Sequence, residues 1–200
     1  MSIYKIISII LHPIFMPFIA IYLSIKLIPS IAFATTNHLY FIYLILIVNT
    51  IILPLISVFF LIKRKWISSI EMNEFKERSL PLFITAICIT LGYYQLEGAL
   101  VFSPILKSEI IGAIIIVACS SAISLYWKIS LHMLALGGVV GITTALNILF
   151  GGLEEIVMLF IFLGGLLGVA RLKEKAHNKA QIYVGCLLGF LIEVSSVLLF

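Results

Sequence analysis

The stretch ARLKEKAHNKAQIYVGCLLGF (residues 170–190) has the organisation that recurs along the chain, in which short polar segments separate long apolar runs. A cationic segment lies between two long apolar runs, and the second run begins near Gln181. His177 and Gln181 are four residues apart, so at the start of a helix they share one face. A neighbouring side chain at that spacing can hold histidine in one tautomer. Arg171 adds a rigid fork of donors suited to a phosphate, which makes this polar turn a candidate for chemistry.

The composition excludes an ordinary soluble domain. Of the 200 residues, 62% are hydrophobic and 11% are charged, and the mean hydropathy is +1.24. Several continuous apolar runs reach the roughly 20 residues that a membrane-spanning helix needs. We therefore predict an all-α, polytopic membrane bundle of about six or seven transmembrane helices, in a single integral membrane domain over residues 1–200. The net charge of +4 then concerns orientation and anionic headgroups rather than nucleic acid.

The apolar runs predict seven spans: residues 6–29, 39–62, 81–95, 110–127, 130–150, 155–170 and 181–200. Pro54 is expected to kink the second span, and the polar stretch 63–80 to form a short surface helix. The last three spans each contain a G-x3-G pattern, which lets helix backbones approach closely. We expect these three helices to form a tight bundle. The cysteines, all within apolar runs, are expected to be packed thiols: Cys88, Cys119 and Cys186.

Counting the spans places three polar segments on the membrane face that holds the N-terminus. They are residues 63–80, 128–132 and 171–180, and we call this the motif face. Residues far apart in the sequence can meet there in one site. Ser130 can cap the fifth helix, whose free amides form an anion site, and His132 can serve as a general acid.

The segment 170–181 resembles the third signature motif of the type 2 phosphatidic acid phosphatase superfamily, SR-x5-H-x3-D. Arg171 and His177 match the arginine and the histidine of that motif. Ala170 stands for its serine and Gln181 for its aspartate. The family histidine is the nucleophile, so the resemblance gives this role to His177.

Two further segments resemble the other motifs of the superfamily in the correct order, so that the likeness covers residues 71–190. Ser130 and His132 match P-S-G-H, reduced here to S-x-H. Glu71 and Arg78 match K-x6-R-P, with glutamate in place of lysine and the proline delayed to Pro81.

The resemblance implies an integral membrane phosphohydrolase that removes phosphate from a lipid or polyprenyl phosphate through a phosphohistidine, without metal or other cofactor. The implied catalytic residues are His177 as nucleophile, His132 as general acid and Gln181 as the orienting group. The implied phosphate-binding residues are Arg171, Arg78 and Ser130.

The departures from the motifs keep alternatives open. Gln181 lacks the negative charge that stabilises imidazolium, and the comparable loss in serine proteases costs roughly 10⁴ in rate. Glu71 opposes phosphate binding. One alternative is therefore an inactive relative that binds a phospholipid headgroup or acts as a membrane subunit of an oligomer or larger complex. Another is a transporter or metal-site protein that uses the following ligands: His12, His132, His177 and Glu71.

Basic residues are concentrated on the motif face. Of the 13 Lys and Arg residues, only Lys26 and Lys107 fall toward the opposite face. The positive-inside rule then places the motif face in the cytoplasm, although relatives in the superfamily generally work on the outward face. We expect a multi-pass protein of the plasma or inner membrane with a cytoplasmic motif face.

Cysteine labelling tests this orientation. A single cysteine at Ser69, in a chain lacking Cys88, Cys119 and Cys186, should react with an impermeant thiol reagent only after the cells are lysed. Strong labelling of intact cells would place the motif face outside and show that family precedent outweighs loop charge.

Overall fold

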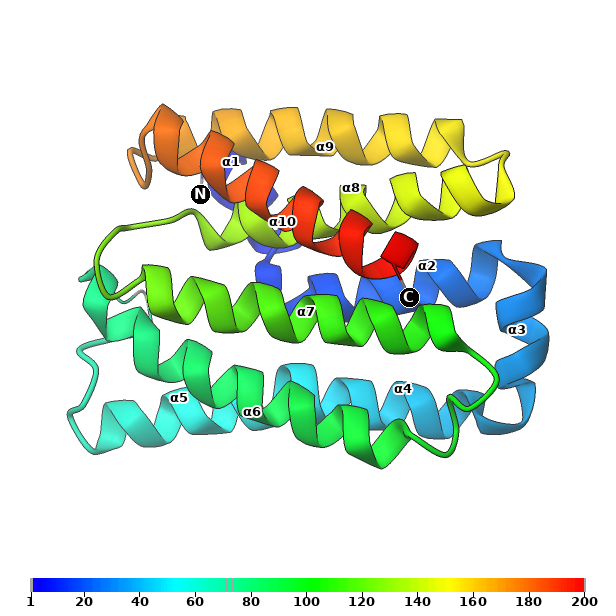
Figure 1. Cartoon of the computed structure of the whole chain (residues 1–200). Coiled ribbons are helices and arrows are strands. Elements are labelled where there is room, and N and C mark those ends of the chain that lie inside the picture. The colour runs from blue at the N-terminus through cyan, green and yellow to red at the C-terminus, as the bar shows by residue number, and fades with distance from the viewer. Residues whose placement is uncertain (1, 71, 73, 200) are drawn as a thin grey trace.

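The computed structural model describes residues 2–70, 72 and 74–199, and the regular elements in these residues are helical. Seven segments are long and apolar enough to cross a membrane, which confirms the predicted all-α membrane bundle. Five of these segments each contain one long helix: α6 (Ser79–Leu96), α7 (Pro104–Ile123), α8 (Leu131–Phe150), α9 (Glu154–Lys173) and α10 (Lys179–Leu199). Among these five helices the largest departure from the predicted bounds is in α7, which begins six residues earlier than expected. The second span departs further, because its helical segment begins at Pro29 rather than at residue 39. The helices lie side by side, with the chain reversals at the two ends of the bundle (Figure 1).

The first span is broken at His12. It consists of α1 (Ile3–Ile10), a 3-10 turn (Pro13–Phe15) and α2 (Met16–Leu27). Because a residue before proline avoids the helical region, His12 is extended, with φ −70° and ψ 135°. The break separates the two halves, so that α1 packs against α9 whereas α2 packs against α8.

The second span is also composite. It contains α3 (Pro29–Thr35), a 3-10 turn (Thr36–His38), α4 (Leu39–Ile47), a π-helical turn (Val48–Ile52) and α5 (Leu53–Lys63). At the predicted Pro54 kink, the π-helical turn directly precedes α5 and the proline. This agrees with the missing amide hydrogen of proline, which disturbs the helical hydrogen-bond ladder. In that turn Asn49 Nδ2 donates to Gln95 Oε1 of α6 over 3.0 Å and ties the second span to the third.

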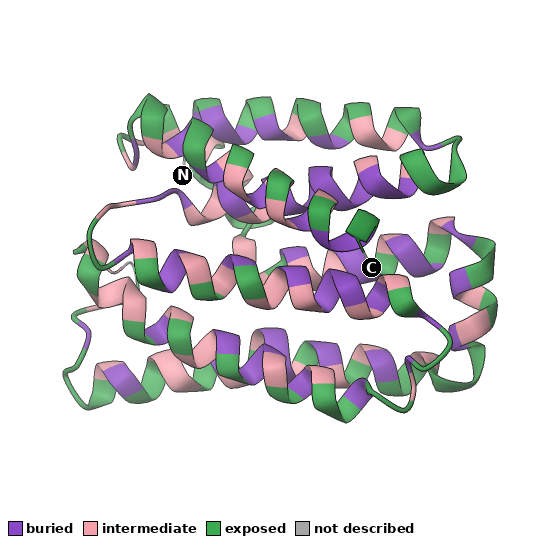
Figure 2. Cartoon of the chain, in the orientation of Figure 1, coloured by how far each residue is buried: buried purple, intermediate pink, exposed green. Residues whose placement is uncertain are grey.

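Helix α8 is the centre of the bundle. In the membrane-spanning part of α8, 67% of the residues are buried, against 22% in that of α9. Figure 2 shows this contrast, with mixed exposed and buried residues on the outer helices. The exposed positions on these outer helices are largely apolar, as expected for a surface that faces lipid.

Glycines bring the backbones of α8 and α10 into direct contact. A methyl group on Gly141 of α8 would lie 2.6 Å from the Phe190 carbonyl oxygen, and one on Gly185 of α10 would lie 2.8 Å from that of Ser130. Gly137 lies against the Cys186 carbonyl in the same way, and Gly189 lies against that of Leu134. The expected close approach is therefore found between the fifth and seventh spans.

The G-x3-G pattern of α9 does not act in this way. A methyl group on Gly164 or Gly168 would meet only side-chain atoms, at 3.6 Å or more. Helix α9 packs on α8 through ordinary side-chain contacts, so the predicted tight packing of three helices applies to two of them.

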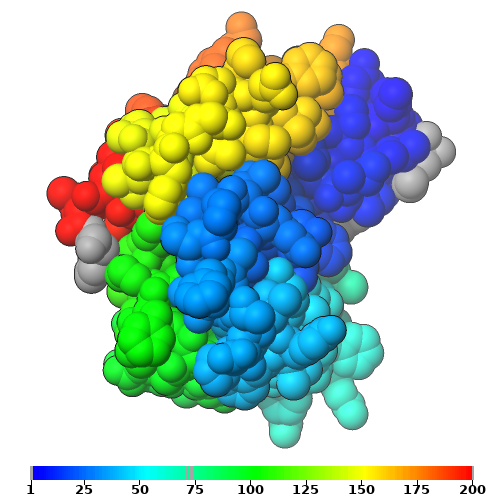
Figure 3. All heavy atoms as spheres, turned by 90° about the vertical axis from the view of Figure 1, so that its right-hand side faces the viewer, coloured from blue at the N-terminus to red at the C-terminus, as the bar shows by residue number. Residues whose placement is uncertain are grey.

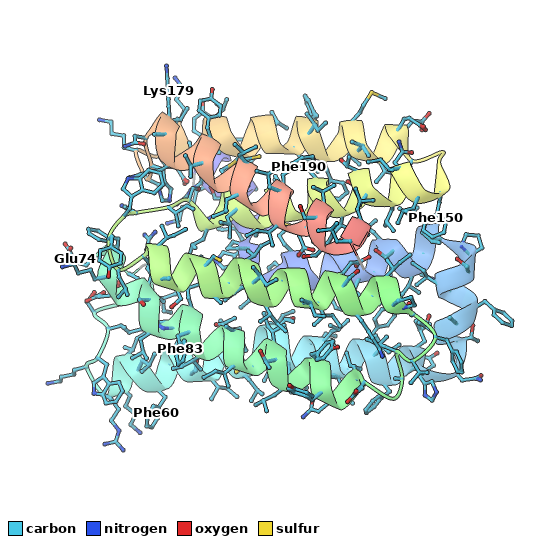
Figure 4. The ribbon with its side chains drawn as sticks, viewed as in Figure 1. Phe60, Glu74, Phe83, Phe150, Lys179 and Phe190 are labelled. Atoms are coloured by element: carbon cyan, nitrogen blue, oxygen red, sulfur yellow. The ribbon has the colours of Figure 1, made fainter. Side chains whose placement is uncertain are left out.

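The motif face is one end of the bundle, where the N-terminus lies (Figure 1). Figure 4 shows Glu74 and Lys179 at this end and Phe150 at the other. The surface helix predicted within the polar stretch 63–80 is a single 3-10 turn (Phe75–Arg78). At the opposite end, the segment around α3 lies between the α8–α9 turn and the α6–α7 loop (Figure 3).

Substitution of Gly189 by alanine tests the helix contact. The new methyl group would overlap the Leu134 carbonyl, and overpacking of this kind costs about 1–3 kcal/mol. We expect a lower midpoint of thermal unfolding in detergent. Gly165→Ala on α9 is the matched control, since a methyl group there meets no other atom within 4 Å. Equal midpoints for the two variants would contradict the proposed contact.

Candidate functional site

Five segments converge at the motif face to form the candidate site. They are the end of α1, the 3-10 turn before α6, the start of α8, the end of α9 and the start of α10. The contact between α8 and α10 fixes their relative register, because the Ser130 amide donates to the Gln181 carbonyl over 3.3 Å. Ser130 and His132 therefore lie beside the turn that holds His177.

The His177 side chain is buried, with 8% exposed, and its tautomer is determined by Gln181. Gln181 Oε1 lies 3.0 Å from His177 Nδ1 and also accepts the Asn178 amide over 3.2 Å. The Gln181 side-chain oxygen can only accept hydrogen bonds. The hydrogen in its contact with His177 must therefore be on Nδ1. The lone pair of Nε2 is then available for nucleophilic attack.

Burial keeps His177 neutral. It lowers the pKa of the imidazole to about 4; the bond to Gln181 raises the pKa, and three cations lower it again: Arg171, Arg78 and Lys128. At neutral pH the ring is uncharged, which is the form that a nucleophile requires. The same three cations favour an anion beside this ring.

Arg171 is held by two groups that the motif analysis does not include. Its Nη1 donates to Glu174 Oε2 over 2.9 Å and to Ser8 Oγ over 3.3 Å. Ser8 of α1 in turn donates to the same Glu174 oxygen over 2.9 Å. The Arg171 Nε is buried and has no partner within the described part of the chain. One donor of the guanidinium is thus fixed in place but unused.

Ser130 occupies the N-cap position of α8, but its hydroxyl makes no capping bond. The residue is fully buried, and Ser130 Oγ lacks a hydrogen-bond partner among the described residues. The sequence leaves open whether this serine caps the helix or binds phosphate. In this structure it does not cap, and an unpartnered buried hydroxyl is costly unless a ligand completes it.

His132 and His12 form a pair beside this serine. Their ring centroids are 5.3 Å apart, with the rings nearly perpendicular. His132 Nε2 lies 3.1 Å from the Ser8 carbonyl, and because a carbonyl only accepts, Nε2 carries the hydrogen. In His12, Nδ1 accepts the Ile14 amide over 3.3 Å, so His12 caps the following 3-10 turn while its ring packs against that of His132.

Two further cations complete the candidate site. Arg78 is half-buried, and its Nε donates to the Met72 carbonyl over 3.1 Å. Burial lowers the pKa of Lys128, and the charges of Arg78 and Arg171 lower it further, while Glu74 raises it. These mutual effects place Lys128, Arg78 and Arg171 within electrostatic reach of one another. Glu71, the first residue of the first motif, lies outside the described residues.

A cavity of about 240 Å³ extends from His12 and Arg78, at the edge of the candidate site, into the membrane interior, and its lining does not include His177, Arg171 or Ser130. His12 and Arg78 line it near the motif face, and apolar side chains of α2, α5, α6, α7 and α8 form most of its walls. Glu193 of α10 is the acidic group that lines it. The cavity has the character of a site for an apolar chain whose charged end lies at the motif face.

Four contributors to the candidate site are missed by the motif analysis: Ser8, His12, Lys128 and Glu174. Ser8 and His12 reach it only because the first span breaks before Pro13, and the sequence signal for this was the His12–Pro13 pair. Lys128 stands directly beside the S-x-H motif, where a third cation could have been considered. Glu174 is the one acidic residue in a strongly basic turn, and no motif in the sequence marks it as a partner of Arg171.

Comparison with known proteins leaves the site to be interpreted on its own chemistry. No family model, no curated protein and no solved structure matches the chain. Among the described residues, no group of three His, Cys, Asp or Glu side chains is placed to hold a metal ion. The residues that do converge are cationic, hydroxyl and imidazole groups, which together suit a phosphate.

Proposed function

We propose that the protein is a membrane phosphohydrolase that removes phosphate from a lipid or polyprenyl phosphate. The observation that carries this proposal is the pairing of a neutral, oriented histidine with buried donors that have no partner. His177 offers a free Nε2, while Arg171 Nε and Ser130 Oγ are buried and unpaired among the described residues. Preorganised donors of this kind stabilise the charge that develops on phosphoryl oxygens.

The reaction has two steps. His177 Nε2 attacks phosphorus and forms a P–N bond, while the P–O bond to the lipid alcohol breaks and the departing oxygen takes a proton. Water then attacks phosphorus, the P–N bond breaks, and inorganic phosphate leaves with His177 regenerated. Splitting one difficult displacement into two is the general advantage of a covalent intermediate.

The proton for the departing alcohol is assigned to His132. Its Nε2 donates to the Ser8 carbonyl, so Nδ1 of the neutral ring carries a lone pair. Nδ1 takes the proton of the bound phosphate monoanion and passes it to the departing oxygen. When water attacks in the second step, the same ring atom takes a proton from the water and passes it to the departing phosphate. Ser8 therefore orients His132 and, through its hydroxyl, also holds Arg171.

Lys128 compensates for the missing lysine of the first motif. The sequence places Glu71 at that position, and Lys128 instead supplies a positive charge within electrostatic reach of Arg78, Arg171 and His177. A phosphate bound here has three cations around it, and charge-assisted hydrogen bonds of this kind are the strong ones. The substrate's apolar chain would lie in the cavity that leads inward from Arg78.

Binding of a phospholipid headgroup without turnover is the second candidate function. It is favoured by the neutral Gln181, which cannot stabilise an imidazolium by charge, and by the ion pair of Arg171 with Glu174 at 2.9 Å. In both cases the partner is a membrane lipid with a phosphate group. We place the candidate site on the cytoplasmic side of the plasma or inner membrane because of the basic residues around it.

Three variants test the enzyme assignment by release of inorganic phosphate from a panel of lipid phosphates, with detergent-purified protein. His177→Ala should lower turnover by about a thousandfold or more, since the nucleophile is lost. Gln181→Asp should keep or raise turnover, because it adds the charge that stabilises imidazolium. His38→Ala is the matched control, since this exposed histidine belongs to the turn at the opposite face.

Turnover that persists unchanged in His177→Ala would remove the nucleophile assignment. If the wild type and Gln181→Asp both bind lipid phosphate without releasing phosphate, headgroup binding becomes the function.

A further inference from the structure

Two glutamates are buried within the membrane-spanning part of the bundle, closer to the face opposite the motif face. Glu109 of α7 and Glu193 of α10 are each 2% exposed. Each lies 14 residues from the end of its helix at the motif face, which at 1.5 Å per residue is about 21 Å. Both carboxyl groups therefore sit at the same depth, and ionisable groups at such depth generally have a function.

Three glycines make room for the Glu193 side chain. Its Oε2 lies against Gly112 of α7, and methyl groups on Gly138 and Gly141 of α8 would lie 3.3 and 3.1 Å from its Cγ and Cβ. Gly112 is three residues from Glu109, so the two positions share one face of α7. The carboxyl groups of two helices thus converge on one place.

The hydrogen bonding of this pair is incomplete. Glu109 Oε1 accepts from Ser24 Oγ of α2 over 2.6 Å. Glu109 Oε2 and Glu193 Oε2 are buried and have no partner in the described part of the chain. Two neighbouring carboxylates in an apolar interior cannot both be ionised without a cation, because desolvation and mutual repulsion act against the charged forms together.

A small cavity joins the two carboxyl groups. It has a volume of about 20 Å³, and Glu109, Glu193 and Thr50 line it together with apolar side chains. This is enough for one water molecule. Glu193 also lines the larger cavity that begins at His12 and Arg78, so the pair is connected to the motif face.

The titratable or charged groups around these two cavities are few. Within the described residues, the lining contributed by the neighbouring helices contains His12, Arg78, Glu109 and Glu193. The two basic groups lie near the motif face, about 20 Å from the carboxyl groups. Lys26 of α2 is exposed and lines neither cavity. A small cation that enters through the larger cavity is the species available to neutralise the pair.

We propose that Glu109 and Glu193 form a proton-binding site inside the membrane, which exchanges with the motif face through the larger cavity. A shared proton turns one carboxylate into a donor that the other carboxylate, or a water in the small cavity, accepts. Ser24 holds Glu109 in place for this exchange. The proposal does not depend on phosphoryl chemistry, since it rests on a separate pair of residues.

Labelling with dicyclohexylcarbodiimide tests the proposal in proteoliposomes made from the full chain. This apolar reagent adds to protonated carboxyl groups, and mass spectrometry of peptides identifies the modified residue. At pH 7 we expect labelling of Glu109 or Glu193 to exceed that of the exposed Glu155 by more than about a hundredfold, since an ordinary glutamate is almost fully ionised there. Labelling of the pair should fall as the pH rises.

Two variants show that the residues act together. Glu109→Gln removes the neighbouring charge, so the labelling curve of Glu193 should move to lower pH, and Glu193→Gln should move that of Glu109 likewise. Glu155 in the same molecule is the internal control for both variants. If a variant does not fold, the wild-type curve alone decides.

Labelling of both glutamates no greater than that of Glu155 at every pH would overturn the proposal. Suppression of labelling by sodium chloride, but not by choline chloride at the same pH, would also overturn it, because sodium rather than the proton would then occupy the site.

Discussion

The direct backbone contact between α8 and α10 is the constraint on which the candidate site depends. Gly141 of α8 and Gly185 of α10 each leave no room for a side chain against a carbonyl group of the other helix or its N-cap residue. These two contacts fix the register of α10 along α8. In that register Ser130 lies beside Gln181, and the His177 ring is buried between the helix starts. Any sliding of α10 would separate the two histidine-bearing segments, so packing and the proposed chemistry share one cause.

The candidate site has an excess of positive charge that its own acidic groups do not neutralise. The charges of Arg78, Arg171 and Lys128 act on the buried neutral imidazole of His177, and Glu174 balances only part of them. Buried donors without a partner, Arg171 Nε and Ser130 Oγ among the described residues, cost stability, and under the proposed function a phosphate accepts from them. Such a cost is typical of a site whose geometry is kept for a ligand rather than for folding.

Much of this arrangement could be predicted from the sequence because it is local. Seven apolar runs predict seven spans, and the four-residue spacing predicts the contact of His177 with Gln181. The places of Ser8 and Glu174 could not be predicted, because they depend on how α1 packs after the break before Pro13. The glycines of α9 show the same limit, since the G-x3-G pattern does not state which helix faces it.

A structure of the protein with orthovanadate, a mimic of the phosphoryl group in transfer, tests the central claim most directly. The account predicts vanadium bonded to His177 Nε2, with its oxygens accepting hydrogen bonds from Ser130 Oγ and Arg171 Nε, two buried donors that have no partner within the described part of the chain. Vanadate bound elsewhere, with Ser130 and Arg171 still unpartnered, would contradict the account.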